Sequence, residues 1–280
     1  MARRLKLLTG LSTIALTGAL ALSGCAGGEG EGAAAGDSAE GAPTAHHGEG
    51  EGEGAPAPLS AGGEAEGAAL VDVAHDKSAF LSALQIVRGH LRAGDELYAV
   101  GDREMGAQHL RHPQAEILTT LAPAFASYGA ANFEPAIDTL ATAAEAGAPP
   151  AEISSRHTEA VREIDAAAQA TGASLKELLL AVARTLTVAG DEYSVGVVDG
   201  AIANLHEYHD AYGFIATAQD DLQAMTGADD AQKSAIAGAI EQVKTAATAA
   251  PRVTPPSEGL LPASVIYGAA ARVEIIARGL

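Results

Sequence analysis

The feature of this sequence that most limits its fold is a helical unit that occurs twice in the later part of the chain. The segment Ala93-Gly94-Asp95-Glu96 recurs 96 positions later as Ala189-Gly190-Asp191-Glu192. An aspartate and two histidines recur 97 positions later, as Asp102, His109 and His112 in the first copy and Asp199, His206 and His209 in the second. One residue inserted in a turn reconciles the two offsets. The repeat predicts two related units that pack against each other.

Within both copies, apolar residues recur every three or four positions, which is typical of amphipathic α-helices. Tryptophan is absent and runs of alternating β-branched residues are scarce. We therefore expect an all-α fold: an internally duplicated antiparallel helical bundle with two units of about four helices each, residues 70–172 and 173–280, related by a pseudo-two-fold axis. The expected helices cover about residues 76–99, 102–125, 132–146, 150–170, 175–196, 199–224 and 228–248, and a last helix ends the chain.

Two aspartates and one proline lie where helices are expected to begin or break. Asp102 and Asp199 each precede the first histidine of their copy by seven residues, which is about 10 Å along a helix axis. One ion cannot comfortably bind both groups from one helix, so we expect both aspartates to be N-caps. Pro113 follows His112 directly. It either breaks the helix there and redirects His112, or it opens the next helix at its first position.

The N-terminus predicts export and lipid attachment. Basic Arg3, Arg4 and Lys6 precede an uncharged apolar run at 7–22, which is too short for a stable membrane-spanning helix. The run closes with Leu22-Ser23-Gly24-Cys25, which resembles the lipobox of bacterial lipoproteins. That resemblance implies cleavage of a signal peptide, residues 1–24, and acylation of Cys25 with palmitate-type chains. By the sorting pattern of that family, Ala26 favours the outer membrane, with the protein facing the periplasm.

The next segment, residues 25–69, is expected to be a disordered tether. It consists mainly of Gly, Ala, Glu, Pro and Ser, and it has too few large apolar side chains to form a core. It contains His46-His47, which are either weak metal-capture residues or incidental. Three of the 17 Lys and Arg residues lie in the signal peptide, so the mature chain has 14 basic and 36 acidic side chains, a net charge of about −22. This charge argues against nucleic acid and favours cations or basic partners.

The pattern that best indicates a function is a His-x-x-His pair, present once in each copy. His109 and His112 form the first pair, and His206 and His209 form the second. Residues three apart share one face of a helix, so each pair can direct two imidazoles at one ion. Histidine is the commonest transition-metal ligand near neutral pH. His75 and His157 have no counterpart in the repeat, and we expect them on the surface. Cys25 is the only cysteine, which excludes an internal disulfide.

Antiparallel packing predicts a further ligand. If the chain reverses near residue 101, His90 lies level with His112, and Glu116 lies one turn beyond. The second copy has no histidine at the place of His90, although Glu192 and Glu207 lie nearby. Two arrangements remain open: a separate and better site in the first copy, or one four-histidine centre between the copies. The candidate metal ligands are therefore His109, His112, His206, His209 and His90.

Three functions fit these observations. The first is a cell-envelope lipoprotein that binds a transition-metal ion (zinc, copper or iron) for uptake, storage or delivery, with an envelope metal transporter as its partner. The second is a haem-binding lipoprotein that uses one histidine from each copy as an axial ligand. The third is a structural or adaptor lipoprotein without a site. We expect no enzyme, because the chain has no nucleophile-elbow, P-loop, dinucleotide or His-Glu-x-x-His motif.

The predicted architecture resembles that of periplasmic iron-binding lipoproteins of the imelysin type, which are also all-helical, duplicated and tethered. The resemblance does not extend to their Gly-x-His-x-x-Glu motif. Gly89-His90 is followed by Leu91, Arg92 and Ala93 instead. No ligand is therefore transferred from that family to this chain.

Overall fold

The computed structural model describes residues 72–280, which fold into helices and one short hairpin. The predicted signal peptide, the acylated Cys25 and the His46-His47 tether lie outside the described residues. The all-α prediction is confirmed. The elements are α2 (Lys77–Val100), α3 (Arg103–Glu116), α4 (Leu118–Tyr128), α5 (Glu134–Glu145), α6 (Pro150–Ala170), α7 (Leu175–Gly196), β1 (Val197–Val198), β2 (Ala201–Ile202), α8 (Leu205–Ala224), α9 (Asp230–Ala247) and α10 (Ser264–Arg278).

Capping residues set several helix boundaries where the sequence predicts them. The Asp76 side chain accepts hydrogen bonds from the amides of Ser78 and Ala79 at the start of α2. Ser174 and Glu177 form a reciprocal capping box at the start of α7. Asp102 accepts a hydrogen bond from the amide of Met105 and caps α3, as expected. These caps satisfy amides that have no partner inside the helix.

The N-cap prediction is wrong for Asp199. This residue has a φ of 52° and lies between β1 and β2, so the chain makes a hairpin where a helix was expected. Helix α8 begins later, at Leu205, and its cap is Asn204, whose side chain accepts from the amide of His206. The inserted hairpin lengthens the turn between the first two helices of the second copy relative to the first.

Neither prediction for Pro113 is correct. Helix α3 continues through Pro113 to Glu116, and the break comes at Ile117, whose amide donates to the carbonyl of Pro113. A proline inside a helix removes one backbone donor but need not end the helix when packing holds the segment. Leu110 and Ile117, on either side of the proline, are both fully buried.

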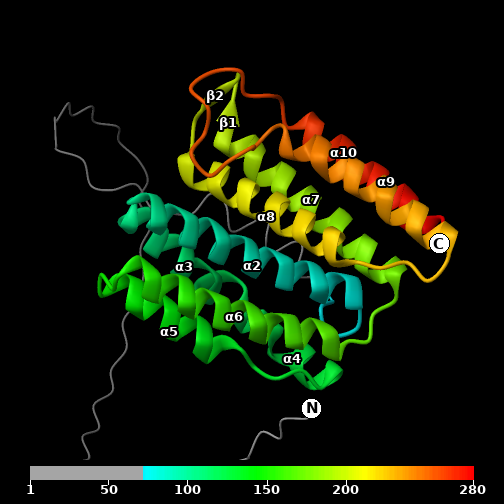
Figure 1. The fold of residues 1–280 in the computed structure, drawn as a ribbon, viewed down its shortest axis with the longest axis horizontal. Helices are drawn as coiled ribbons and strands as arrows, with labels where there is room; N and C mark the ends of the chain where they lie inside the picture. The colour runs from blue at the N-terminus through cyan, green and yellow to red at the C-terminus, as the bar shows by residue number, and fades with distance from the viewer. Residues whose placement is uncertain (1–71) are drawn as a thin grey trace, which may run out of the picture. The chain divides into compact units, whose positions relative to one another are not determined.

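Helices α2 and α8 lie side by side in the middle of the described part of the chain (Figure 1). Helix α2 also packs against α3, α6 and α7, and α7 packs against α8 and α10. Buried side chains from both predicted units belong to one hydrophobic core. The pseudo-two-fold relation is incomplete, because the extensive contact between α2 and α8 has no comparable counterpart between α7 and α3.

Two buried tyrosines show how far the structural repeat extends. Tyr98, near the end of α2, donates its hydroxyl to the carbonyl of Ala148 at 2.7 Å. Tyr193, near the end of α7 and one position before the residue that the 96-residue offset pairs with Tyr98, donates to the carbonyl of Ala249 at 3.2 Å. Each bond ties its helix to a later connection, between α5 and α6 in the first unit and between α9 and α10 in the second. The two units therefore share this kind of tie, although the first has five described helices and the second has four.

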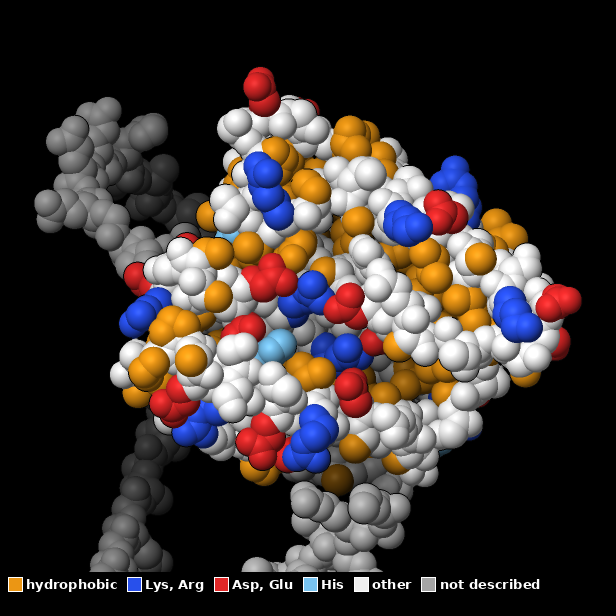
Figure 2. All heavy atoms as spheres, viewed as in Figure 1, with side chains coloured by type: hydrophobic (Ala, Val, Ile, Leu, Met, Phe, Trp, Pro, Cys, Tyr) orange, Lys and Arg blue, Asp and Glu red, His pale blue; other side chains and the backbone are white. Residues whose placement is uncertain are grey.

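Figure 2 shows basic and acidic side chains interspersed on one face. Ion pairs also join α2 to its neighbours. Arg88 forms ion pairs with Asp165 of α6 and Asp221 of α8. Arg92 pairs with Asp220 of α8 and with Glu96 of its own helix. These pairs fix α2 against the helices on both sides. Between residues 72 and 280, no helix is both long and apolar enough to cross a lipid bilayer.

Helices α2 and α8 approach closely because glycine occupies both sides of their crossing. A Cβ atom placed on Gly213 would lie 2.2 Å from the carbonyl oxygen of Gly89, and one on Gly89 would lie 2.9 Å from the amide nitrogen of Phe214. Backbone atoms cannot move aside as a flexible side chain can. The spacing of α2 and α8 therefore depends on these two glycines.

We predict that Gly213→Ala lowers the free energy of unfolding by about 2–3 kcal/mol, because the added methyl group forces α2 and α8 apart. Chemical denaturation followed by circular dichroism measures this. Gly268→Ala is the matched control in α10, where the nearest atom to a new Cβ is the far end of the Arg272 side chain. That control should be neutral or stabilising by up to about 1 kcal/mol. Equal effects of the two substitutions would contradict the close-crossing argument.

Candidate metal centre

Five histidines and one aspartate from three helices form a single cluster inside the bundle. Helix α2 supplies one residue, α3 supplies two, and the first turns of α8 supply three. All are buried except one, which is half-buried. The members of this cluster, called the histidine centre below, are His90, His109, His112, His206, His209 and Asp210.

The carboxylate of Asp210 is the point at which the three helices meet. Its Oδ1 lies 2.7 Å from Nδ1 of His90 and 2.9 Å from Nδ1 of His109. Its Oδ2 lies 3.7 Å from Nε2 of His206. An ionised carboxylate only accepts, so both Nδ1 atoms are donors. Asp210 thus sets the tautomers of two rings at once.

Neighbouring histidines keep the carboxyl group of Asp210 ionised. Burial raises the pKa of this carboxyl group, but His90 and His109, by their charge and their hydrogen bonds, outweigh the burial and hold its pKa well below the usual value. Asp210 is 1% exposed. A buried negative charge surrounded by imidazoles is a favourable place for a cation.

The two His-x-x-His pairs meet with local two-fold symmetry. His109 and His206, which are equivalent in the repeat, stack with ring centroids 3.9 Å apart. Nδ1 of His112 lies 3.1 Å from Nε2 of His206, and Nδ1 of His209 lies 3.3 Å from Nε2 of His109. The repeat pairs His109 with His206 and His112 with His209. Replacing each histidine by its repeat partner therefore turns one contact into the other, between the same ring atoms. The repeat is therefore most symmetric at the histidines.

Burial keeps the second pair neutral. It lowers the pKa of His206 to about 4 and that of His209 to about 3, in each case against the raising effect of Asp210. A neutral imidazole offers a nitrogen lone pair to a metal ion without first losing a proton. Nδ1 of His206 is also buried without a hydrogen-bond partner among the described residues. Such a buried nitrogen loses its hydration without gaining a protein partner.

The donor spacing fits metal coordination. With ligand bonds of about 2.0–2.1 Å, neighbouring donors lie about 3.0 Å apart around an octahedral ion and about 3.3 Å apart around a tetrahedral one. Four nitrogen–nitrogen and nitrogen–oxygen pairs of the histidine centre lie between 2.7 and 3.3 Å, and a fifth, between His206 and Asp210, lies at 3.7 Å. Donor atoms of His90, His112 and Asp210 all lie within 4.8 Å of one another, and so do those of His109, His206 and Asp210.

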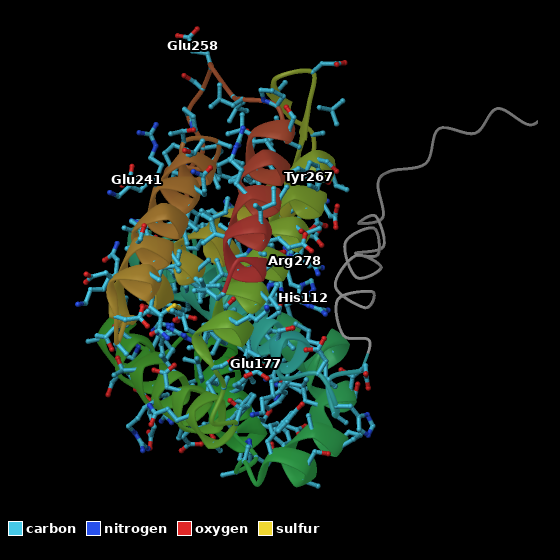
Figure 3. The ribbon with its side chains drawn as sticks, turned by 90° about the vertical axis from the view of Figure 1, so that its right-hand side faces the viewer. His112, Glu177, Glu241, Glu258, Tyr267 and Arg278 are labelled. Carbon is cyan, nitrogen blue, oxygen red and sulfur yellow. The ribbon has the colours of Figure 1, made fainter. Side chains whose placement is uncertain are left out.

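Ion pairs to α5 hold α3, which carries two of the histidines. Arg111, between the two histidines of α3, donates to Asp138 at 2.8 Å and to Glu145 at 2.7 Å, both on α5. These ion pairs orient α3 so that His109 and His112 face inward. His112, labelled in Figure 3, is the half-buried member of the centre. Solvent and ions therefore reach the centre most directly at the contact between His112 and His206.

The structure brings together all five histidines that the sequence singles out. His90 lies level with His112, with ring centroids 4.7 Å apart, as antiparallel packing predicts. Of the two arrangements left open, the joint centre between the copies is the observed one. Glu192 and Glu207 are buried but belong to neither group of converging donors. That these residues bind metal stays a prediction.

Asp210 is the residue of the histidine centre that the sequence analysis missed. It lies one residue after His209 and four after His206, a spacing that places it on the same side of α8. The repeat concealed it, because the equivalent position in the first copy is Pro113. His90 likewise has no histidine counterpart in α7. The two groups that complete the centre are therefore those that depart from the repeat.

The ring packing disfavours haem. Two axial histidines must lie on opposite faces of a flat macrocycle. In the histidine centre the rings of His109 and His206 contact each other directly, as do those of His90 and His112. A porphyrin would have to separate helices that share a close-packed core. The geometry fits ions rather than a planar cofactor.

One protein family is similar to part of the chain. Residues 172–265 match the family described as the iron permease-associated 4-helix bundle domain. The match covers about a third of the chain and includes α7, α8, α9 and the start of α10. It contains His206, His209 and Asp210 but not the three histidines of α2 and α3. No curated protein and no solved structure was found to match the chain.

The two histidines that lie outside the centre between residues 72 and 280 differ in exposure. His75 is exposed, as expected, and contacts Asp72 at 2.8 Å. The surface prediction is wrong for His157, whose side chain is 19% exposed and lies 3.7 Å from Asp95. Burial first, and then the charges of Arg92 and Arg88, lower the pKa of His157 to about 4. His157 is therefore neutral in the folded protein at pH values where the unfolded chain would protonate it.

This difference predicts a pH-dependent contribution to stability. Between pH 6.5 and 4, the unfolded chain binds a proton at His157 that the folded chain does not, so stability falls as pH falls through this window. From pH 7.5 to 5.0 the loss should amount to up to about 2 kcal/mol. Urea denaturation at both pH values should show a smaller loss for His157→Gln than for the parent. An equal loss in His75→Gln and His157→Gln would contradict the assignment.

Proposed function

We propose that this chain is a lipid-anchored protein of the cell envelope that binds a transition-metal ion at the histidine centre and serves in metal uptake or delivery. Iron is the first candidate, and zinc and copper are the alternatives. A metal permease of the same envelope is the proposed partner. The protein acts by binding rather than by catalysis.

The observation that carries this proposal is the convergence of five histidines around one buried carboxylate. Burying so many polar groups is costly unless they are bonded to one another or to a ligand. A purely structural role would be served by apolar side chains of similar size, as in the surrounding core. A bound metal ion would offset the cost of burying these polar side chains together.

Two observations favour iron. The family match over residues 172–265 concerns a domain that accompanies iron permeases. The donor set also suits the ferrous ion, because each group of converging donors has two histidines and one carboxylate. That set is the one found in mononuclear non-haem iron sites. Zinc and copper accept imidazole equally well, so a direct measurement must choose among the three.

The anchor and tether supply the cellular setting of the proposal. Acylation of Cys25 would hold the protein at a membrane surface, and residues 26–69 would let the helical domain move at a distance from it. The acidic surface would raise the local concentration of cations. If the protein were attached close to a permease, the ion could pass to the permease without diffusing freely through the envelope.

We predict that the mature chain with Cys25→Ser, purified without a tag and reconstituted with iron, zinc or copper, retains metal in stoichiometric amount. His109→Ala and His206→Ala should each lower the affinity by at least about tenfold, because each removes a ring from the middle of the centre. Inductively coupled plasma mass spectrometry after gel filtration measures the content. His75→Ala, an exposed histidine outside the centre, is the matched control and should bind like the parent.

A parent protein that holds no metal after reconstitution with any of the three ions would refute the proposed function. Retention of metal by His109→Ala and His206→Ala at parental affinity would place the ion elsewhere. Circular dichroism of each variant separates loss of a ligand from loss of the fold.

We further predict that Cys25→Ser releases the protein from the membrane. The acyl chains are the proposed attachment to the membrane, and no helix between residues 72 and 280 is long and apolar enough to cross it. Fractionation of cells should find the parent in the membrane fraction and the variant in the soluble fraction. Metabolic labelling with a fatty acid should mark only the parent. A variant that stays with the membrane would show that another contact holds it there.

A further inference from the structure

The two groups of converging donors have a single residue in common. One group is His90, His112 and Asp210, and the other is His109, His206 and Asp210. No histidine is used twice. A carboxylate has two oxygen atoms and can bind a different ion with each or bridge two ions through one.

The position of Asp210 fits this shared role. Its Oδ1 contacts a histidine of each group, His90 at 2.7 Å and His109 at 2.9 Å, while its Oδ2 faces His206 at 3.7 Å. The carboxylate therefore lies between the two groups and not at the edge of one. Because Asp210 is only 1% exposed, no carboxylate can approach it from solvent to bind the ions in its stead.

From these contacts we propose that the histidine centre is a dinuclear site, which binds two divalent ions bridged by the carboxylate of Asp210. The first ion takes His90, His112 and Asp210, and the second takes His109, His206 and Asp210. The inference rests on the proposed metal-binding function and specifies its stoichiometry and its ligands. Each ion has two histidines and one carboxylate and completes its coordination with water.

His209 has a different role in this arrangement. Nδ1 of His109 contacts Asp210, and Nε2 of the same ring lies 3.3 Å from Nδ1 of His209. His209 thus orients a ligand ring from outside the two donor groups, as residues beyond the direct ligands commonly do. Loading the centre displaces the protons now held between the donor atoms.

Charge sets the order of loading. Asp210 supplies one negative charge for two divalent ions, and an imidazole that binds a metal ion does so in its neutral form. The first ion cancels the field that attracted it, so the second ion binds more weakly. A singly loaded form should therefore precede the doubly loaded form in a titration.

The test is native mass spectrometry of the mature Cys25→Ser chain during titration with zinc, and with ferrous iron under anaerobic conditions. The parent should pass through one bound ion and saturate at two. His90→Ala and His206→Ala, which each remove a ligand of one group only, should saturate at one ion. Asp210→Asn should hold at most one, and His75→Ala should still hold two.

Saturation of the parent at one ion would overturn the dinuclear inference and leave the proposed function standing, whereas no bound ion would overturn both. If Asp210 only orients its histidines, Asp210→Asn should keep the same number of ions as the parent, with an affinity about 10- to 100-fold weaker. A measurement on the parent alone guards against variants that fail to fold. With two equivalents of manganese, electron paramagnetic resonance should show a spin-coupled pair, and the spectrum of isolated ions would contradict the bridge.

Discussion

The hydrogen bonds from His90 and His109 to the Asp210 carboxylate are the interactions on which the rest of this structure depends. They join α2, α3 and α8 through one buried charge, and they set the tautomers of two imidazoles. Water cannot replace them, because Asp210 is 1% exposed. Removing any one partner would leave the others buried without compensation, which costs more than the bond itself contributes. The three helices that carry the centre are therefore held in one arrangement by the same groups that are proposed to bind metal.

The close crossing of α2 and α8 makes this arrangement possible. Gly89 and Gly213 bring the two backbones together within one turn of His90 and Asp210. Arg88 and Arg92 secure the same pair of helices from the solvent side. This contact has no equivalent between α7 and α3, so it is also the place where the pseudo-two-fold relation ends. Duplication supplied four symmetric histidines, and the asymmetric contact added His90 and Asp210, which turn those histidines into a centre with a negative charge.

A large part of this could be predicted from residues alone, and the failures have local causes. Periodicity and prolines located the helices, and Asp102 caps its helix as expected. The N-cap prediction for Asp199 failed because aspartate is favoured both at helix N-caps and at turn positions with positive φ, so the residue type alone does not distinguish the two. Pro113 misled because buried neighbours hold a helix together across a missing hydrogen bond. His157 misled because a polar side chain between helices looks, in sequence, like one on the surface.

The sequence by itself determined the helical class, the repeat and the identity of five histidines, because spacing along a helix fixes which side chains share a face. It also placed His90 level with His112, since an antiparallel turn fixes which positions oppose each other. Only the tertiary structure decided that the two pairs form one centre rather than two, and that Asp210 lies at its middle. Those facts depend on how α8 packs across α2 and α3, which no spacing within one helix encodes. Asp210 lacks a counterpart in the repeat, and its role appears only where residues about a hundred positions apart meet.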